Sequence, residues 1–293
     1  GDLVHRVYLE CEDAVDSNYG GVTATGLVDE VELEIGGQLI DRHCGKWMDI
    51  WVELTHDSAK KAQYKDMTEG SGDKHWMPLQ FSFCRNPGLA IPLIALQYHE
   101  VKLNIRFGDD VPANVCLYCD YIYLDTDERR RFAQTSHEYL IEQTQSSKSN
   151  AIAAGCANKV PLHFNHPVKE LVWCFDNTAK EDEAKVLLRL NGHERFSARC
   201  GAYFSRVQRY QHHTGAKVVG GYEDELQMYS FALQPEEHQP SGTCNFSRID
   251  NAMLEVSGLD VDDSSKAACV DVYAMNYNVL RIMSGMGGLA YSN

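Results

Sequence analysis

Cysteine is the most reactive residue type in this chain, and ten cysteines are spread along its 293 residues. Cys116 and Cys119 form the single C-x-x-C pair. A structural zinc site needs two further thiolate or imidazole ligands at matching spacing, and the sequence has neither a second C-x-x-C nor an H-x-x-x-H. The pair also lies in a strand-like run, where positions three apart face opposite sides. The pattern favours free thiols in a reducing compartment.

Two groups of histidines could bind a metal ion if their rings converged. His163 and His166 are three residues apart, and Pro167 predicts an extended backbone at His166, so the two rings should diverge. His212 and His213 are adjacent and should face opposite sides of an extended segment. We therefore expect polar loop histidines and no metal site.

Other motifs with known chemistry are incomplete. Asp260, Asp262 and Asp263 lack the spacing and the final glutamate of a calcium loop. The glycines of Gly285–Ala290 do not form G-x-G-x-x-G, and the sequence has no nucleophile elbow, Walker A motif or H-E-x-x-H. We therefore predict no catalytic, cofactor-binding or metal-binding residues, no cofactor, and a protein that is not an enzyme.

One short stretch, Gln239–Asn251 (QPSGTCNFSRIDN), combines several signals. Its Pro240-Ser-Gly242 predicts a turn, because proline fixes φ and glycine supplies a positive φ. Asn245-Phe-Ser247 is the single N-x-S/T sequon, which makes Asn245 a candidate N-glycosylation site. Strand-like runs on both sides favour a turn that enters a strand.

Composition indicates a folded, acidic protein. The chain is 44% hydrophobic and 24% charged, enough apolar material for a sizeable core, and no run approaches the ~18–20 apolar residues that cross a bilayer. Net charge is −15, and the basic run Arg129–Arg131 follows Asp125, Asp127 and Glu128. Since nucleic-acid binding depends on Lys and Arg neutralising phosphates, we expect no direct contact with nucleic acid.

Alternation of apolar and polar residues dominates the chain. In Val31–Ile35 apolar residues alternate with acids, and Gly36-Gly37 then predicts a turn. Val101–Phe107 reads as a half-buried strand, with its odd-numbered residues inward. Similar runs occur at Leu3–Leu9, Val115–Leu124, Val168–Phe175, Val186–Leu190, Met228–Leu233, Met253–Val256 and Val270–Ile282. Short strands separated by turn residues predict an all-β, mainly antiparallel fold.

Two segments depart from this alternation. Trp47–Leu54 carries apolar residues at helical spacing and predicts an amphipathic helix. Thr126–Gln145 predicts a strand end followed by a helix, and the polar stretch Glu142–Asn150 (EQTQSSKSN) is the best linker candidate. A linker here divides the chain into two β domains of similar size, 1–140 and 146–293.

Longer blocks of the sequence resemble the major capsid proteins of nucleocytoplasmic large DNA viruses, in the order in which that family carries them. The blocks are Gly1–Glu10 (GDLVHRVYLE), Glu34–Thr55, Pro78–Phe107 (PLQFSFCRNPGLAIPLIALQYHEVKLNIRF), Tyr121–Gln143, Tyr229–His238, Gln239–Ala252 (QPSGTCNFSRIDNA) and Tyr273–Asn293 (YAMNYNVLRIMSGMGGLAYSN). Together they span nearly the whole chain.

The resemblance implies two consecutive eight-stranded jelly-roll sandwiches, a double jelly roll, with short helices in the connections. It implies homotrimers that form pseudo-hexameric capsomers and tile an icosahedral virion shell around an internal membrane. The implied partners are further copies of the chain, minor capsid proteins under the shell and, indirectly, the membrane, after assembly in the host cytoplasm. Family members usually carry a stretch before Gly1–Glu10, so we expect the N-terminal strand of the first jelly roll to be missing.

Two alternative functions stay open at this point. A scaffolding or minor shell protein could use the same double jelly roll. A carbohydrate-binding or carbohydrate-cleaving β-sandwich belongs to another class, and it predicts a cleft with paired carboxylates about 5–10 Å apart.

Overall fold

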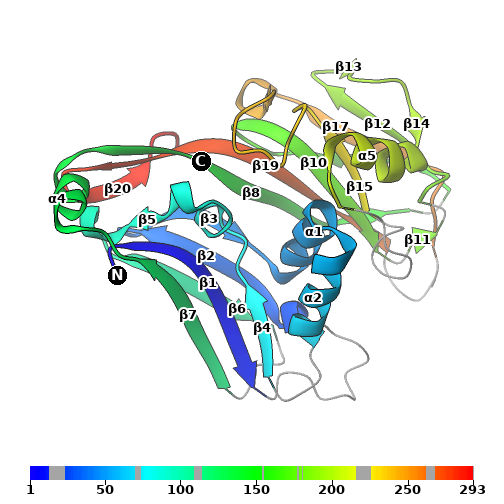
Figure 1. Cartoon of the computed structure of the whole chain (residues 1–293). Helices are drawn as coiled ribbons and strands as arrows, with labels where there is room; N and C mark the ends of the chain where they lie inside the picture. The colour runs from blue at the N-terminus through cyan, green and yellow to red at the C-terminus, as the bar shows by residue number, and fades with distance from the viewer. Residues whose placement is uncertain are drawn as a thin grey trace. The chain divides into compact units, whose positions relative to one another are not determined.

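The computed structural model describes residues 1–12, 24–69, 74–108, 114–153, 155–176, 178–179, 181–215, 226–261 and 268–292. Within these residues strands are the main element, and short helices lie in the connections between them (Figure 1). The chain folds into two compact units. Unit 1 comprises Gly1–Val52, Ala59–Gln143 and Asn278–Asn293, and unit 2 comprises Glu53–Ser58 and Thr144–Tyr277.

The two units do not coincide with the predicted domains 1–140 and 146–293. They differ in that Asn278–Asn293 groups with unit 1 and Glu53–Ser58 with unit 2. The predicted domain bounds stay a prediction.

The acidic motif that was compared with a calcium loop is described only in part. Asp260 lies in the described residues, whereas Asp262 and Asp263 lie outside them.

Unit 1 contains two antiparallel sheets. One has the order β4-β1-β5 with β7 also paired to β1, and the other has the order β3-β2-β6. Their bounds are β1 Leu3–Glu12, β4 Lys74–Pro78, β5 Ile91–Pro92, β7 Asn114–Ile122, β2 Val28–Ile35, β3 Gln38–His43 and β6 Val101–Phe107. The predicted turn between β2 and β3 is confirmed: Gly36 and Gly37 have φ angles of 59° and 81°, which glycine adopts without a Cβ clash.

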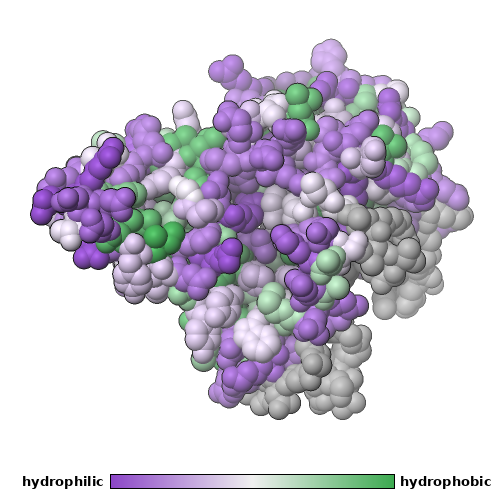
Figure 2. All heavy atoms as spheres, viewed as in Figure 1, coloured by the Kyte–Doolittle hydropathy of each residue, from purple (hydrophilic) through white to green (hydrophobic). Residues whose placement is uncertain are grey.

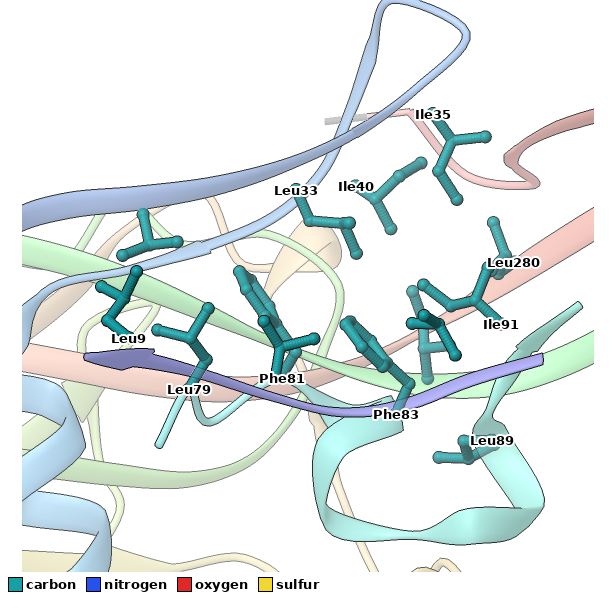
Figure 3. Packing of buried hydrophobic residues seen from close by; sticks show 14 of the residues in the cluster. Leu9, Leu33, Ile35, Ile40, Leu79, Phe81, Phe83, Leu89, Ile91 and Leu280 are labelled. Carbon is teal, nitrogen blue, oxygen red and sulfur yellow. The ribbon is translucent and has the colours of Figure 1, made fainter. Parts of the chain in front are cut away.

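The core of unit 1 is formed by side chains from these sheets and the segments that connect them. Figure 3 shows Leu33, Ile35 and Ile40, from β2 and β3, in the same buried cluster as Phe81 and Phe83. The two phenylalanine rings stack with centroids 5.7 Å apart, and both side chains are buried. Each large apolar side chain buried in this way contributes about 1.5–3 kcal/mol to folding.

Unit 2 contains the second pair of large sheets. In one, the order is β15-β10-β19, with β16 paired to β10 and β8 paired to β19; the end of β19 pairs with β20 within unit 1. The other has the order β13-β12-β17-β9, with β14 on β12. Their bounds are β15 Leu226–Ser230, β10 Pro167–Asp176, β19 Ala268–Met283, β16 Cys244–Asn245, β8 His137–Ile152, β20 Met286–Leu289, β13 His193–Glu194, β12 Lys185–Leu190, β17 Ala252–Ser257, β9 Ala157–Pro161 and β14 Arg199–Cys200. β11 (Thr178–Ala179) and β18 (Asp260–Val261) form a small separate pair.

The core of unit 2 contains a cluster of aromatic side chains. Trp173 is fully buried on β10, and its ring centroid lies 5.3 Å from that of Phe204. Phe196 lies 5.2 Å from Phe204 and 4.9 Å from Tyr229, measured between ring centroids. Offset and tilted ring pairs of this kind are favoured by the quadrupoles of the rings, in addition to the area that they bury.

The helices are α1 Gly45–Thr55, α2 Ser58–Glu69, α3 Ser82–Arg85, α4 Thr126–Gln134 and α5 Arg209–His212, with the π-helical η4 Tyr203–Gln208 and the 3₁₀ turns η1 Ala24–Leu27, η2 Pro87–Leu89, η3 Leu93–Ala95 and η6 Phe246–Arg248. The predicted helix at Trp47–Leu54 is confirmed by α1, and Trp47, Ile50, Trp51 and Leu54 are all buried. In the part of the chain that the structure describes, no helix has both the length and the apolar composition to span a membrane.

The segment predicted as a linker, Glu142–Asn150, does contain the boundary between the two units, at Gln143 and Thr144, but it is a strand and not an irregular connection. These residues lie within β8, a 16-residue strand that pairs with β19. Polar residues can occupy a buried strand when their hydrogen bonds are satisfied. Here Gln145 donates to the Asn276 side chain and to the Asn165 carbonyl, each at 2.8 Å, and accepts from the Asn165 amide at 2.9 Å. Composition alone does not reveal these partners.

Candidate functional site

The cysteines singled out in the sequence do not come together in a metal site. Cys119 packs against the core of unit 1, whereas Cys116 is exposed, as expected for strand positions three apart. All ten cysteines lie in the described residues, and no disulfide joins any two of them. Among the residues that the structure describes, no three His, Cys, Asp or Glu side chains are grouped closely enough to hold a metal ion.

The backbone prediction at His166 is wrong. His166 has a φ of +65°, not the extended conformation expected before Pro167. Its amide donates to Ser247 Oγ at 2.8 Å and its carbonyl accepts from the Phe246 amide at 3.0 Å, so two backbone hydrogen bonds support the unusual conformation. The His166 side chain is buried, and His163 is exposed.

The sequon residue Asn245 is exposed at the end of β16. Its side-chain oxygen accepts from the Ser247 amide at 3.1 Å and so caps the 3₁₀ turn η6. Gly242, in the predicted turn before it, has a φ of +145°. Glycosylation of Asn245 stays a prediction, and the geometry adds a structural role for the same side chain.

The expectation of a polar loop histidine is wrong for His213, which lies at the centre of a buried polar cluster in unit 2 that sequence reasoning missed. Nε2 of His213 donates to Glu170 at 2.8 Å, and Nδ1 donates to Glu236 at 2.9 Å. The side chains of His213 and Glu170 are fully shielded from solvent, while that of Glu236 is about one-fifth exposed. An imidazole that donates from both nitrogens is a cation, so the cluster joins one positive group to two carboxylates.

The protonation of His213 follows from these neighbours. Burial by itself would lower its pKa, but the charge and the hydrogen bond of Glu170, together with Glu236, outweigh it and raise the pKa to about 9. For Glu236, burial favours a raised pKa, whereas the hydrogen bonds from His213 and from the Thr214 amide lower it overall. Both groups therefore stay charged at neutral pH.

Two further buried cations belong to the same region of unit 2. Arg209 donates to the carbonyl of Glu53 at 2.8 Å and forms an ion pair with the Glu53 carboxylate. Lys169, which adjoins Glu170 on β10, donates to the Pro235 carbonyl at 2.5 Å. The Lys169 ammonium also lies 5.6 Å from the centre of the Tyr277 ring.

The cluster ties separate chain segments to one another. β10 supplies Lys169 and Glu170, the end of α1 supplies Glu53, α5 and the residues after it supply Arg209 and His213, and the loop after β15 supplies Glu236. Two adjacent charges within the buried strand β10 were the sequence signal that could have revealed it, because such charges are rarely buried unless paired. These contacts fix the positions of β10, the end of α1, α5 and the loop after β15 relative to one another.

Exposed hydrophobic side chains mark surfaces that could contact other chains. On the face drawn in Figure 2, hydrophilic side chains predominate and hydrophobic ones occur in small separate groups. In unit 1 the exposed residues include Tyr98, Met283 and Met286 around the β19–β20 turn, and Leu117, Tyr118, Tyr121 and Tyr123 on or after β7. In unit 2 they are Val207, Tyr210 and Leu233.

Comparison with known proteins covers almost the entire chain. A family model described as large eukaryotic DNA virus major capsid protein matches residues 128–187 and 182–288, and one described as major capsid protein N-terminus matches residues 1–125. The chain is 48% identical to a major capsid protein of Pyramimonas orientalis virus, over 100% of this chain and 84% of that protein. It is 37% identical to the major capsid protein of Paramecium bursaria Chlorella virus 1, over 100% and 86%.

Solved structures agree with the sequence comparison. The quasi-atomic model of the PBCV-1 virus capsid matches with a TM-score of 0.83 at 34% identity, covering 100% of this chain and 91% of that one. The Faustovirus major capsid protein matches with a TM-score of 0.65 at 13% identity, covering 95% and 74%, a likeness of fold alone. The predicted double jelly roll is confirmed. The chain belongs to the family of large eukaryotic DNA virus major capsid proteins.

Proposed function

We propose that this chain is the major structural subunit of a virion shell, in which homotrimers form pseudo-hexameric capsomers that tile an icosahedral lattice. The observation that carries the proposal is the match over the full chain to a protein of a solved virus capsid, at 34% identity and a TM-score of 0.83. Relatives matched over 100% of the chain are themselves major capsid proteins.

The physical features of the molecule suit this role. Assembly needs large complementary interfaces, which aromatic side chains and arginines commonly anchor. The described surface carries exposed tyrosines in both units, including Tyr98 at 77% and Tyr210 at 89% exposure. Buried charged contacts such as those of His213 hold surface segments in fixed positions, which lowers the ordering cost of binding.

The finer parts of the proposal concern the surroundings of the shell. We expect contacts with minor capsid proteins beneath it, an indirect relation to an internal membrane, assembly in the host cytoplasm, and neither catalysis nor direct contact with nucleic acid. The net charge of −15 supports the last of these expectations.

Size-exclusion chromatography with light scattering on the complete protein tests the proposal. The expected result is a particle of three times the mass of the single chain, which is 33.0 kDa for residues 1–293. A stable monomer at every concentration tried would contradict the proposal. Protein abundance in purified virions then separates a major subunit from a scaffolding protein, since a scaffold is lost on maturation whereas the major subunit dominates the gel.

A further inference from the structure

The hairpin β12–β13 in unit 2 carries the single Asn-Gly dipeptide of the sequence, Asn191-Gly192. These two residues form the loop between the paired strands, in which Leu190 lies opposite His193. Their φ angles are +51° and +80°, and positive values at both central positions are characteristic of a type I′ turn. Both residues are exposed. The turn therefore presents to water an asparagine of the most reactive kind.

An asparagine that precedes glycine can undergo an intramolecular substitution. The backbone nitrogen of Gly192 attacks Cγ of Asn191, a new N–Cγ bond replaces the Cγ–Nδ2 bond, and ammonia leaves with the proton of the attacking amide. Water then opens the resulting succinimide at either of its carbonyls and gives aspartate or isoaspartate. Glycine favours the attack because it has no Cβ that obstructs the approach to its nitrogen. Among the described residues, none would lie within 4 Å of a Cβ added at Gly192, so the site is also open.

The folded turn holds Asn191 away from the geometry that this attack requires. In a type I′ turn the ψ angle of the first central residue is about +30°, which places the next nitrogen nearly opposite to Cβ about the Cα–C bond. The Asn251 amide donates to Oδ1 of Asn191 at 3.1 Å, and the Asn191 amide donates to the Asn251 carbonyl at 2.7 Å. Backbone and side chain of Asn191 are both fixed, so the turn has to open before the Gly192 nitrogen can reach Cγ.

We propose that Asn191 is a site of spontaneous deamidation, at a rate set by the opening of the β12–β13 hairpin. The hairpin is suited to opening, because β13 has two residues, both exposed. Its strands are joined by an ion pair between Arg189 and Glu194 at 3.0 Å, whose side chains are 35% and 49% exposed, and exposed ion pairs add little stability. Peripheral segments of this kind open locally more often than a core does. The reaction needs only the turn and water, so the inference does not depend on the proposed function.

The isoaspartate product does not fit the original turn. It adds one carbon to the main chain and puts a carboxylate in place of the amide. The pairing of Leu190 with His193 and the two hydrogen bonds to Asn251 depend on the unmodified backbone. The modified hairpin therefore stays open, and the contact with the residue that directly precedes β17 is lost. Deamidation at this site is an irreversible local change in unit 2.

Peptide mapping by mass spectrometry on the complete protein tests the site. The protein is incubated at neutral pH with and without denaturing guanidinium chloride, and isoaspartate is labelled with an isoaspartate methyltransferase and a labelled methyl donor. Asn191 should react in both samples, but at least about tenfold more slowly in the folded protein, because opening precedes the reaction. Asn191→Gly, which accepts the positive φ, should give no product at this position.

Three results of this mapping would overturn the proposal. Absence of product at Asn191 in the unfolded chain would remove the site. Equal rates in the two samples would remove the role of the turn. Absence of product from the folded protein, after the unfolded sample has reacted completely, would show that the hairpin does not open.

A weakened hairpin tests the role of opening. Glu194→Ala removes the ion pair with Arg189 and should raise the ratio of the folded to the unfolded rate about two- to fivefold. Lys159→Ala is the matched control, because it removes an exposed ion pair with Glu255 in the same sheet but outside the hairpin, and it should keep the wild-type ratio. The ratio cancels any direct effect of the substituted charge on the chemistry. Equal ratios in all three proteins would contradict control by opening.

Hydrogen exchange on the modified protein measures the structural consequence. The Arg195 amide, which donates to the Leu188 carbonyl at 2.8 Å just beyond the hairpin, should lose protection in chains that carry isoaspartate. The Val172 amide on β10, a strand paired on both sides, should keep its protection. Unchanged protection of the Arg195 amide would show that the hairpin re-forms and would overturn the irreversible opening.

Discussion

At the scale of single residues, two buried histidines show how neighbours decide charge. Burial, with a smaller effect from Arg85, lowers the pKa of His43 to about 3, so this ring is neutral; it packs edge-on against Phe81 with centroids 4.4 Å apart. His213 is equally shielded, but two carboxylates hold it charged. The same residue type therefore serves as a neutral packing group in unit 1 and as a buried cation in unit 2.

The charge on His213 predicts a loss of stability at alkaline pH. Its pKa is raised from 6.5 to about 9 in the folded protein, so its contribution is fully present below pH 6.5 and is lost as the pH rises through 9. The difference corresponds to about 3 kcal/mol. Urea unfolding of the wild type at a series of pH values should show this decline.

The matched variants for this prediction are His213→Gln and His212→Gln. His213→Gln should be less stable by about 3–5 kcal/mol at neutral pH, because Glu170 loses a buried charge partner, and its stability should fall less between pH 6.5 and 9. His212→Gln, which changes a more accessible ring, should keep the wild-type profile. An alkaline decline that is the same in His213→Gln and wild type would contradict the assignment.

Asn245 allows a test of two roles of one side chain. If Asn245 acts as the cap of η6, Asn245→Ala should lower the free energy of unfolding by about 1 kcal/mol in protein made without glycosylation, whereas Asn245→Asp should retain most of it. Intact-mass analysis of virion protein tests the predicted modification separately. A mass equal to that of the bare chain would remove Asn245 as a glycosylation site.

At the scale of elements, alternation and helical spacing were reliable where a segment has one apolar face. β6 spans the predicted Val101–Phe107, and α1 covers the predicted Trp47–Leu54. Prediction failed where polar residues have hydrogen-bond partners that are distant in the sequence, because composition alone does not show those partners. The polar end of β8 looks like a linker because its buried hydrogen-bond partners, such as Asn276, lie more than 100 residues away. His213 was missed for the same reason, since Glu170 is 43 residues distant.

The polar hydrogen bonds of β8 predict a specific cost when they are removed. Gln145→Ala deletes three hydrogen bonds to Asn165 and Asn276 and should destabilise the protein by about 1 kcal/mol, the net contribution typical of hydrogen bonds that are not fully buried. Lys148→Ala, at an exposed position of the same strand, should change stability by less than about 0.5 kcal/mol. Chemical unfolding of both variants measures the difference. Equal stability of the two would mean that this part of β8 behaves as the linker that its composition suggests.

At the scale of the whole molecule, the balance of charge argues against contact with nucleic acid. The basic run on α4 does not act as a free positive patch, because Arg129 pairs with Asp2 at 2.9 Å and Arg130 with Asp127 at 3.8 Å. Any local attraction for phosphates is opposed by the net charge of −15.

We therefore predict that the complete protein binds duplex DNA more weakly than a Kd of about 10⁻⁴ M at physiological salt, the weak end of non-specific DNA binding. Fluorescence anisotropy of a labelled duplex, with a known basic DNA-binding protein as the positive control, measures this. Tight binding that falls steeply with salt would contradict this prediction.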